Sequence, residues 1–123
     1  MPQSYRDLRV WQSSMAMVRE VYLATKRFPY DEHDGLRSQL RRAAVSVPSN
    51  IAEGKGRSNR DFSRFLMIAR GSNWELQTQL EIARDLGYLS AETASRLLKE
   101  AEDVSRMLNG MLTAFSSRQM AVS

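Results

Sequence analysis

Four long segments of the chain repeat their apolar residues every three or four positions, as one face of an α-helix does. These segments cover about residues 7–27, 32–53, 59–86 and 91–115. No segment alternates apolar and polar residues with the two-residue period of a β-strand. Because the connections between segments are short, we predict an all-α fold: an up-down-up-down antiparallel four-helix bundle that forms one domain, residues 1–123.

Residues that start and stop helices flank the apolar segments. Pro29 ends the first helix, because proline lacks an amide hydrogen and disfavours helix at the residue before it. We expect Asp31 to cap the second helix and to begin an acidic first turn. Ser58 or Asn59 is expected to cap the third helix, and Ser90 the fourth.

Pro48 lies inside the second helical segment, where proline removes one backbone hydrogen bond. The apolar register nevertheless continues through Ile51, so we predict a kinked helix that reaches Glu53. The two glycines just after Glu53 are expected to end this helix in the left-handed cap conformation. Residues 116–123 show no pattern and are expected to fray.

The third segment has two apolar stripes, where a monomeric bundle needs one. The first stripe comprises Phe62, Leu66, Ala69, Leu76, Leu80 and Ala83. The second comprises Phe65, Ile68, Ile82 and Leu86, and is interrupted by Ser72, Glu75 and Gln79. Such a broad apolar arc predicts that the third helix also faces another subunit of a homo-oligomer.

The composition narrows the class of protein. The chain has no cysteine, which excludes disulfides and thiol catalysis and fits a reducing compartment. No apolar run has the length of a signal peptide or of a membrane span. We therefore expect a soluble, cytoplasmic domain.

Positive charge is concentrated in the middle of the chain. The net charge is +4, yet residues 35–70 contain eight basic residues and two acidic ones. The candidate nucleic-acid-binding residues in this region are Arg37, Arg41, Arg42, Lys55, Arg57, Arg60 and Arg64. Arginine suits phosphate, and the start of the third helix adds free amides, so we expect salt-sensitive backbone binding with little sequence specificity. The alternative is that Arg41 or Arg42 pairs with Glu53 or Glu75 inside the assembly.

The sequence argues against catalysis and against a metal or other cofactor. The single histidine, His33, lies in an acidic connection that helix capping explains better than metal binding. Lys55 follows Gly54, but the segment lacks the remaining positions of a phosphate-binding loop. Glu53 and Glu75 are better explained as members of a buried polar network than as an acid/base pair. We predict that the chain is not an enzyme.

Three blocks of the chain carry a family resemblance. They read YRDLRVWQ at the start, SQLRRAAVSVPSNIAEG over residues 38–54, and SRFLMIARGSNWELQTQLEIARDLGYL over residues 63–89. The chain resembles the four-helix-bundle proteins encoded in intervening sequences of bacterial 23S ribosomal RNA genes. That resemblance implies a four-helix protomer and a homopentamer. The family is also similar to the accessory protein of diversity-generating retroelements, a basic pentamer that associates with a reverse transcriptase and with nucleic acid.

Five polar residues fall in or beside these blocks and are interpreted as a structural polar network: Asn50, Glu53, Ser72, Glu75 and Gln79. Semi-buried polar groups need partners, and Asn50 and Glu53 are the natural ones for the three residues of the third helix. The leading functional hypothesis is an oligomeric accessory protein that binds RNA or DNA. The alternative is a protein-interaction scaffold whose basic surface docks an acidic or reverse-transcriptase-like protein.

Overall fold

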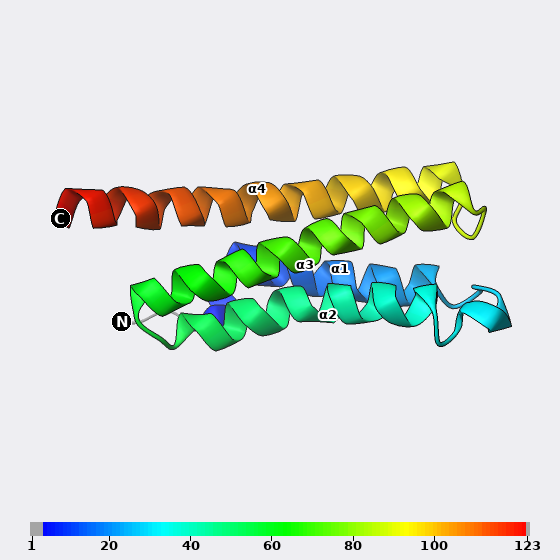
Figure 1. The fold of residues 1–123 in the computed structure, drawn as a ribbon, viewed down its shortest axis with the longest axis horizontal. Helices are drawn as coiled ribbons and strands as arrows, with labels where there is room; N and C mark the ends of the chain where they lie inside the picture. The colour runs from blue at the N-terminus through cyan, green and yellow to red at the C-terminus, as the bar shows by residue number, and fades with distance from the viewer. Residues whose placement is uncertain (1–3, 123) are drawn as a thin grey trace.

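The computed structural model describes residues 4–122, and the side chains of residues 4–116. The chain forms four α-helices: α1 (Arg9–Ala24), α2 (Leu36–Lys55), α3 (Asn59–Asp85) and α4 (Ala91–Val122), with no strand in the described part. Short 3₁₀ turns, Tyr5–Asp7 and Tyr30–Glu32, precede α1 and α2. Successive helices run in opposite directions and lie side by side as a bundle (Figure 1). The all-α prediction is confirmed.

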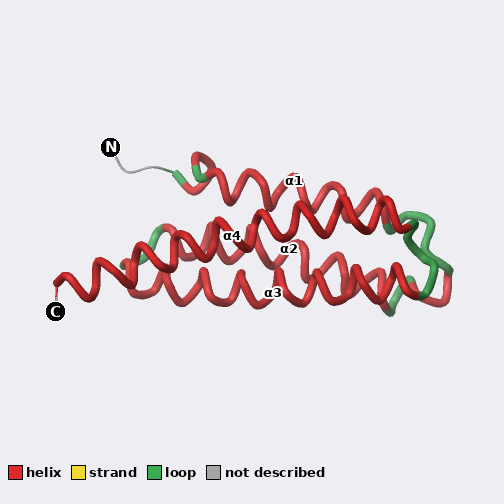
Figure 2. Tube along the Cα trace, turned by 90° about the horizontal axis from the view of Figure 1, so that it is seen from above, coloured by secondary structure: helices red, strands yellow, loops and turns green. Residues whose placement is uncertain are grey.

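The connections divide between the two ends of the bundle. The α1–α2 and α3–α4 connections lie at one end, and the α2–α3 turn lies at the other (Figure 2). The basic residues of the α2–α3 turn are therefore separated from the start of α2 by the length of that helix, about 30 Å at 1.5 Å per residue.

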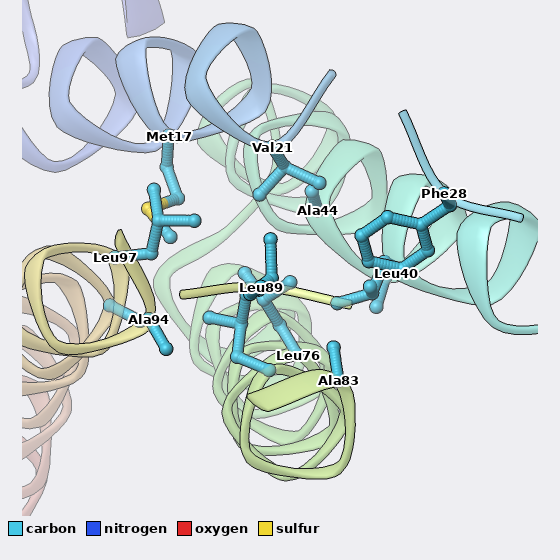
Figure 3. Close-up of a cluster of buried hydrophobic side chains, with 13 residues drawn as sticks. Met17, Val21, Phe28, Leu40, Ala44, Leu76, Ala83, Leu89, Ala94 and Leu97 are labelled. Carbon is cyan, nitrogen blue, oxygen red and sulfur yellow. The ribbon is translucent and has the colours of Figure 1, made fainter. Parts of the chain in front are cut away.

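Apolar side chains from all four helices fill the interior in two clusters. One cluster, shown in Figure 3, packs Met17 and Val21 of α1 against side chains of the other helices. The other contains Val10, Val47, Ile51, Phe62, Leu66, Ala69, Val104 and Leu108. Every residue of the first predicted stripe on α3 is at most 5% exposed, so that stripe is the core face of the helix.

α2 continues through Pro48 to Lys55, as the apolar register predicts. Pro48 itself is buried, because its side chain faces the interior with the rest of that register. The prediction of a left-handed cap is wrong for this helix: Gly56 has a φ of −82°. Instead, among the described residues only Gly87 has a positive φ, 78°, and it ends α3. There the amide of Tyr88 donates to the carbonyl of Ala83 at 2.9 Å, which closes a Schellman-type cap.

The helix starts are partly as expected. The Ser58 and Ser90 side chains accept hydrogen bonds from first-turn amides of α3 and α4, as predicted. The prediction for α2 is wrong. Glu32, and not Asp31, binds its first amide, that of Leu36, at 3.0 Å, and the first turn of α2 contains no acidic residue.

Glu32 also ties the two connections at this end of the bundle together. Its second carboxylate oxygen accepts a hydrogen bond from the Tyr88 hydroxyl at 3.1 Å. This hydrogen bond raises the pKa of the Tyr88 hydroxyl above its ordinary value, because it favours the protonated phenol. The glutamate therefore both caps α2 and holds the α3–α4 connection.

The chain ends differ from the expectation. α1 begins only at Arg9, because residues 5–7 form a 3₁₀ turn. α4 continues as helix to Val122, so the predicted fraying of residues 116–123 is wrong for 116–122, while Ser123 lies outside the described residues. None of the helices in the described part combines the length and apolar character that a bilayer span requires.

Candidate nucleic-acid interface

The seven candidate basic residues do not form one patch. Arg37, Arg41 and Arg42 lie in the first two turns of α2, while Lys55 is its last residue. Arg57, Arg60 and Arg64 follow in the α2–α3 turn and the start of α3. We call Lys55, Arg57, Arg60 and Arg64 the turn cluster. It lies at the opposite end of the bundle from Arg37.

Arg41 is bound to the end of α1. Its Nε donates to the Thr25 hydroxyl at 2.9 Å, and its terminal nitrogen donates to the Tyr22 carbonyl at 3.2 Å. The guanidinium also lies 4.4 Å from the centroid of the Tyr22 ring. A cation at a helix C-terminus satisfies carbonyls that have no partner within the helix. Arg41 therefore joins α1 to α2, and its partners are neither Glu53 nor Glu75.

Arg42 faces a different neighbour. Together with Gln39, Ser46, Ser72 and Glu75 it lines a polar groove between α2 and α3. Arg41 and Arg42 are adjacent in sequence but point to different sides of α2, because successive residues of a helix are about 100° apart. Only the Arg42 side of the helix adjoins the polar residues of α3.

The predicted polar network lies partly in this groove. Asn50 donates to the Ser46 carbonyl and hydroxyl at 2.8 and 3.0 Å, and the Ser46 hydroxyl lies 2.8 Å from that of Ser72. Gln79 donates to Glu75 at 3.0 Å. Ser46 thus links two residues that sequence reasoning could only place near each other.

Two features of the groove differ from the expectation. Glu53 lies outside the network, because its carboxylate pairs with Arg57 at 3.4 Å. Gln39, a residue that sequence reasoning did not include, accepts a long hydrogen bond from Gln79 at 3.5 Å. Gln39, Ser46 and Asn50 recur at helical spacing along α2, which is the pattern that would have revealed them.

The turn cluster is supported by two phenylalanine rings. The guanidinium groups of Arg57 and Arg64 lie 4.9 and 4.8 Å from the centroid of the Phe65 ring. The Lys55 ammonium lies 5.9 Å from the Phe62 ring. Stacking on an aromatic face restrains a charged group without neutralising it, so these side chains are held while their charge stays available.

Arg60 and Arg64 share an open hollow at the start of α3. Asp61, Ser63 and Met67 complete its lining. The first turn of α3 begins here, with the Ser58 side chain accepting from the Asp61 amide at 3.3 Å. An anion placed in the hollow would meet two guanidinium groups beside a helix N-terminus. It would also meet the Asp61 carboxylate, which opposes it.

Acidic side chains gather on a different surface, between α1 and α4. Arg96 donates to Glu20 at 2.8 Å and lies 3.8 Å from Glu100. Burial, followed by the charge of Glu20, raises the pKa of the Glu100 carboxyl above its ordinary value despite Arg96. The hydrogen bond to Glu20 raises the pKa of Arg96. Within the described part of the chain, no three metal-ligating side chains are placed to hold an ion.

Sequence reasoning missed two neighbouring residues of α3. Asn73 is 1% exposed and donates to the Ala101 carbonyl and the Ser105 hydroxyl, both at 2.7 Å. Trp74, next in sequence, is 51% exposed. The core register of α3 passes through position 73, so a polar residue there was the available signal for the first. For the second, the available signal was its helical spacing from Arg60 and Arg64.

The fold and the turn cluster define a small four-helix bundle with four cationic side chains at the α2–α3 connection. The model of the 23S rRNA-intervening sequence proteins matches residues 6–110, and the chain belongs to this family. Comparison with curated proteins gives no match.

The fold is shared with a solved structure. A protein of unknown function from the S23 ribosomal protein family of Bacteroides thetaiotaomicron VPI-5482 superimposes with a TM-score of 0.76 at 23% sequence identity. The alignment covers 84% of this chain and 97% of that protein. At this identity the likeness concerns the fold alone.

Proposed function

We propose that this protein is a non-enzymatic, oligomeric accessory protein that binds the phosphate backbone of RNA or DNA through the turn cluster. The observation that carries the proposal is the convergence of Arg57, Arg60 and Arg64 at one end of the bundle, beside the N-terminus of α3. Arg57 alone of these three has a carboxylate partner, Glu53, and that pair is exposed.

The energetics favour binding to phosphate. An exposed ion pair such as Arg57–Glu53 contributes little, about 0–1 kcal/mol, so a phosphate can replace the carboxylate at small cost. Guanidinium groups that rings already restrain lose less freedom on binding. Phosphate contacts carry no base information, so binding should be salt-dependent and weakly sequence-specific.

An oligomer would multiply the effect of each cluster. Ile68, Ile82 and Leu86 of the second α3 stripe are 43%, 43% and 56% exposed in the protomer. Covering them with another subunit would remove this apolar surface from water. The family resemblance implies a pentamer, in which five turn clusters would bind one polyanion multivalently.

The competing function is a scaffold that docks an acidic or reverse-transcriptase-like protein. The internal use of Arg41 favours it, because one of the seven candidate basic residues is thereby removed from a nucleic-acid surface. A protein partner would require a shaped interface in addition to charge. A nucleic-acid-binding protein should therefore bind many polyanions, whereas the scaffold should bind only a partner that fits its interface.

The test is a titration with a labelled structured RNA and a matched DNA duplex at low and near-physiological salt. We expect binding that weakens steeply with salt, and its loss when Arg57, Arg60 and Arg64 are all replaced by Ser. The matched control replaces Arg19, Lys26 and Lys99 by Ser, which removes the same charge from exposed positions elsewhere. Unchanged affinity in the turn-cluster variant, or equal loss in both variants, would contradict the proposal.

The oligomer has its own test. Light scattering of the purified protein should give the mass of several protomers, and Ile68→Lys should lower it. A monodisperse monomer would contradict the interpretation of the second α3 stripe.

A further inference from the structure

The outward face of α3 carries an unusual stripe beyond the turn cluster. Arg60, Arg64, Met67, Gly71 and Trp74 follow one another at intervals of four, three, four and three residues, so they lie along one side of the helix. All five are exposed, and Met67 and Trp74 are 49% and 51% exposed. A large aromatic ring therefore lies on the same face as two arginines of the turn cluster.

One face of the Trp74 ring is covered by the guanidinium of Arg70. The Arg70 guanidinium lies 4.9 Å from the ring centroid, and its terminal nitrogen donates to the Asn109 side chain of α4 at 3.0 Å. A guanidinium covers one face of an indole and leaves the other for a second planar partner. Gly71, one turn earlier, has nothing within 4 Å of where its Cβ would be, so the surface beside the ring is open.

We propose that Trp74 is a stacking platform for an unpaired base of a single-stranded nucleic acid whose backbone lies on Arg60 and Arg64. The proposal rests on the proposed function, and it narrows the ligand to single strands. Arginines that track a backbone beside an aromatic ring that stacks a base are the two parts of a single-strand binding surface.

The dimensions agree with such a ligand. Arg60 and Trp74 are fourteen residues apart on one helix, which is about 21 Å. At 3.4 Å per stacked nucleotide this distance corresponds to roughly six nucleotides. A duplex of the same length hides its base faces, so it can reach the arginines but not stack on the ring.

The charge of the stripe favours a single-stranded nucleic acid over a second copy of the chain as its ligand. From Arg60 to Trp74 the stripe contains two cations and no carboxylate, and a third cation, Arg70, lies under the ring. Two carboxylates flank the stripe: Asp61, in the hollow beside Arg60, and the exposed Glu75, next to Trp74 in sequence. A polyanion with planar bases satisfies both ends of the stripe.

The experiment uses Trp74 as its own probe. The chain has two tryptophans, so Trp11→Phe leaves Trp74 as the only one. This protein is titrated at low salt with unstructured ten-nucleotide RNA and DNA strands and with a matched duplex. We expect quenching of Trp74 fluorescence by single strands and not by the duplex. Whichever of the RNA and DNA strands quenches Trp74 at the lower concentration is the preferred ligand.

Three variants then separate stacking from charge. Trp74→Ala should weaken single-strand binding by roughly 5- to 100-fold while changing duplex binding less than about twofold. Trp74→Phe should keep most of the affinity. Tyr30→Ala, which removes an aromatic ring that is 85% exposed at the other end of the bundle, should have no effect. Circular dichroism of each variant confirms that the helices are formed.

The other outcomes are distinct. In the first, single strands and duplex both bind without quenching Trp74, and Trp74→Ala binds single strands normally. In that case the stacking proposal for Trp74 is wrong, while backbone binding by the turn cluster is retained. If no nucleic acid binds at low salt, both proposals fail. If iodide cannot quench Trp74 in the free protein and Trp74→Ala lowers the oligomer mass, a second copy covers this face, and the platform is overturned.

Discussion

Gly54 of α2 lies directly against Phe65 of α3: a Cβ atom on the glycine would be 2.7 Å from the Cβ of the phenylalanine. The two helices approach this closely just before the α2–α3 turn. Phe65 in turn supports the guanidinium groups of Arg57 and Arg64. The absence of a side chain at position 54 therefore helps to set the geometry of the turn cluster.

We expect Gly54→Ala to destabilise the protein by about 1–3 kcal/mol, because the added methyl group meets backbone-proximal atoms that cannot simply rotate away. Urea unfolding followed by circular dichroism measures the change. The control is Gly110→Ala in α4, where nothing lies within 4 Å of the new Cβ and helix propensity predicts a gain of about 0.5–1 kcal/mol. Equal stability of Gly54→Ala and the parent would show that α2 and α3 can move apart at no cost.

The buried Asn73 is expected to be important for joining α3 to α4. Replacing it with Ala removes two 2.7 Å hydrogen bonds in the interior and should cost about 1–3 kcal/mol in the free energy of unfolding. Gln77→Ala is the comparison, since Gln77 binds the same Ser105 hydroxyl at 3.1 Å from a half-buried position. A larger loss for Gln77→Ala than for Asn73→Ala would reverse this assignment.

Glu100 should make stability depend on pH. Its folded-state pKa is raised, mainly by burial, so the folded state favours the protonated carboxyl relative to the unfolded chain. That contribution is present below the unfolded-state pKa and is lost as pH rises through the folded-state pKa.

Glu100→Gln should therefore gain stability relative to the parent as pH rises from about 4 to about 7. Thermal unfolding at a series of pH values measures the difference. Glu102→Gln, which removes the same charge from an exposed position on α4, should show a flatter profile. A difference that shrinks toward neutral pH would mean that the pairing of Glu100 with Arg96 outweighs its burial.

Arg41 and Arg60 should have opposite roles. Arg41→Ala breaks the bonds to Thr25 and Tyr22 and should lower stability by about 1–3 kcal/mol while leaving RNA affinity within about twofold. Arg60→Ala should weaken RNA binding and reduce its salt dependence with little effect on unfolding, because Arg60 is exposed. If Arg41→Ala reduces RNA binding as much as Arg60→Ala without loss of stability, Arg41 belongs to the binding surface.

Much of the fold was predictable because its signals are local. The core stripe of α3 and the caps at Ser58 and Ser90 depend on residues a few positions apart in the chain. The continuation of α2 through Pro48 followed from the apolar register, which packing on both sides of the proline maintains. Where the local signal was wrong, at the start of α2, the neighbouring and longer side chain of Glu32 replaces that of Asp31, and it also accepts a hydrogen bond from the distant Tyr88.

The sequence by itself determined the four helices, the side of each that is buried, and the excess of positive charge in the middle of the chain. The tertiary structure decided which charges are available. Arg41 is bound because α1 places Thr25 beside it, sixteen residues away in sequence, while Arg60 is exposed because it lies on the outward face at the start of α3. It also left Trp74 uncovered, 51% exposed, on the face of α3 that sequence spacing shares with Arg64. Periodicity specifies the face of a helix on which a residue lies, but only the packing of neighbouring helices decides whether that face is covered or exposed.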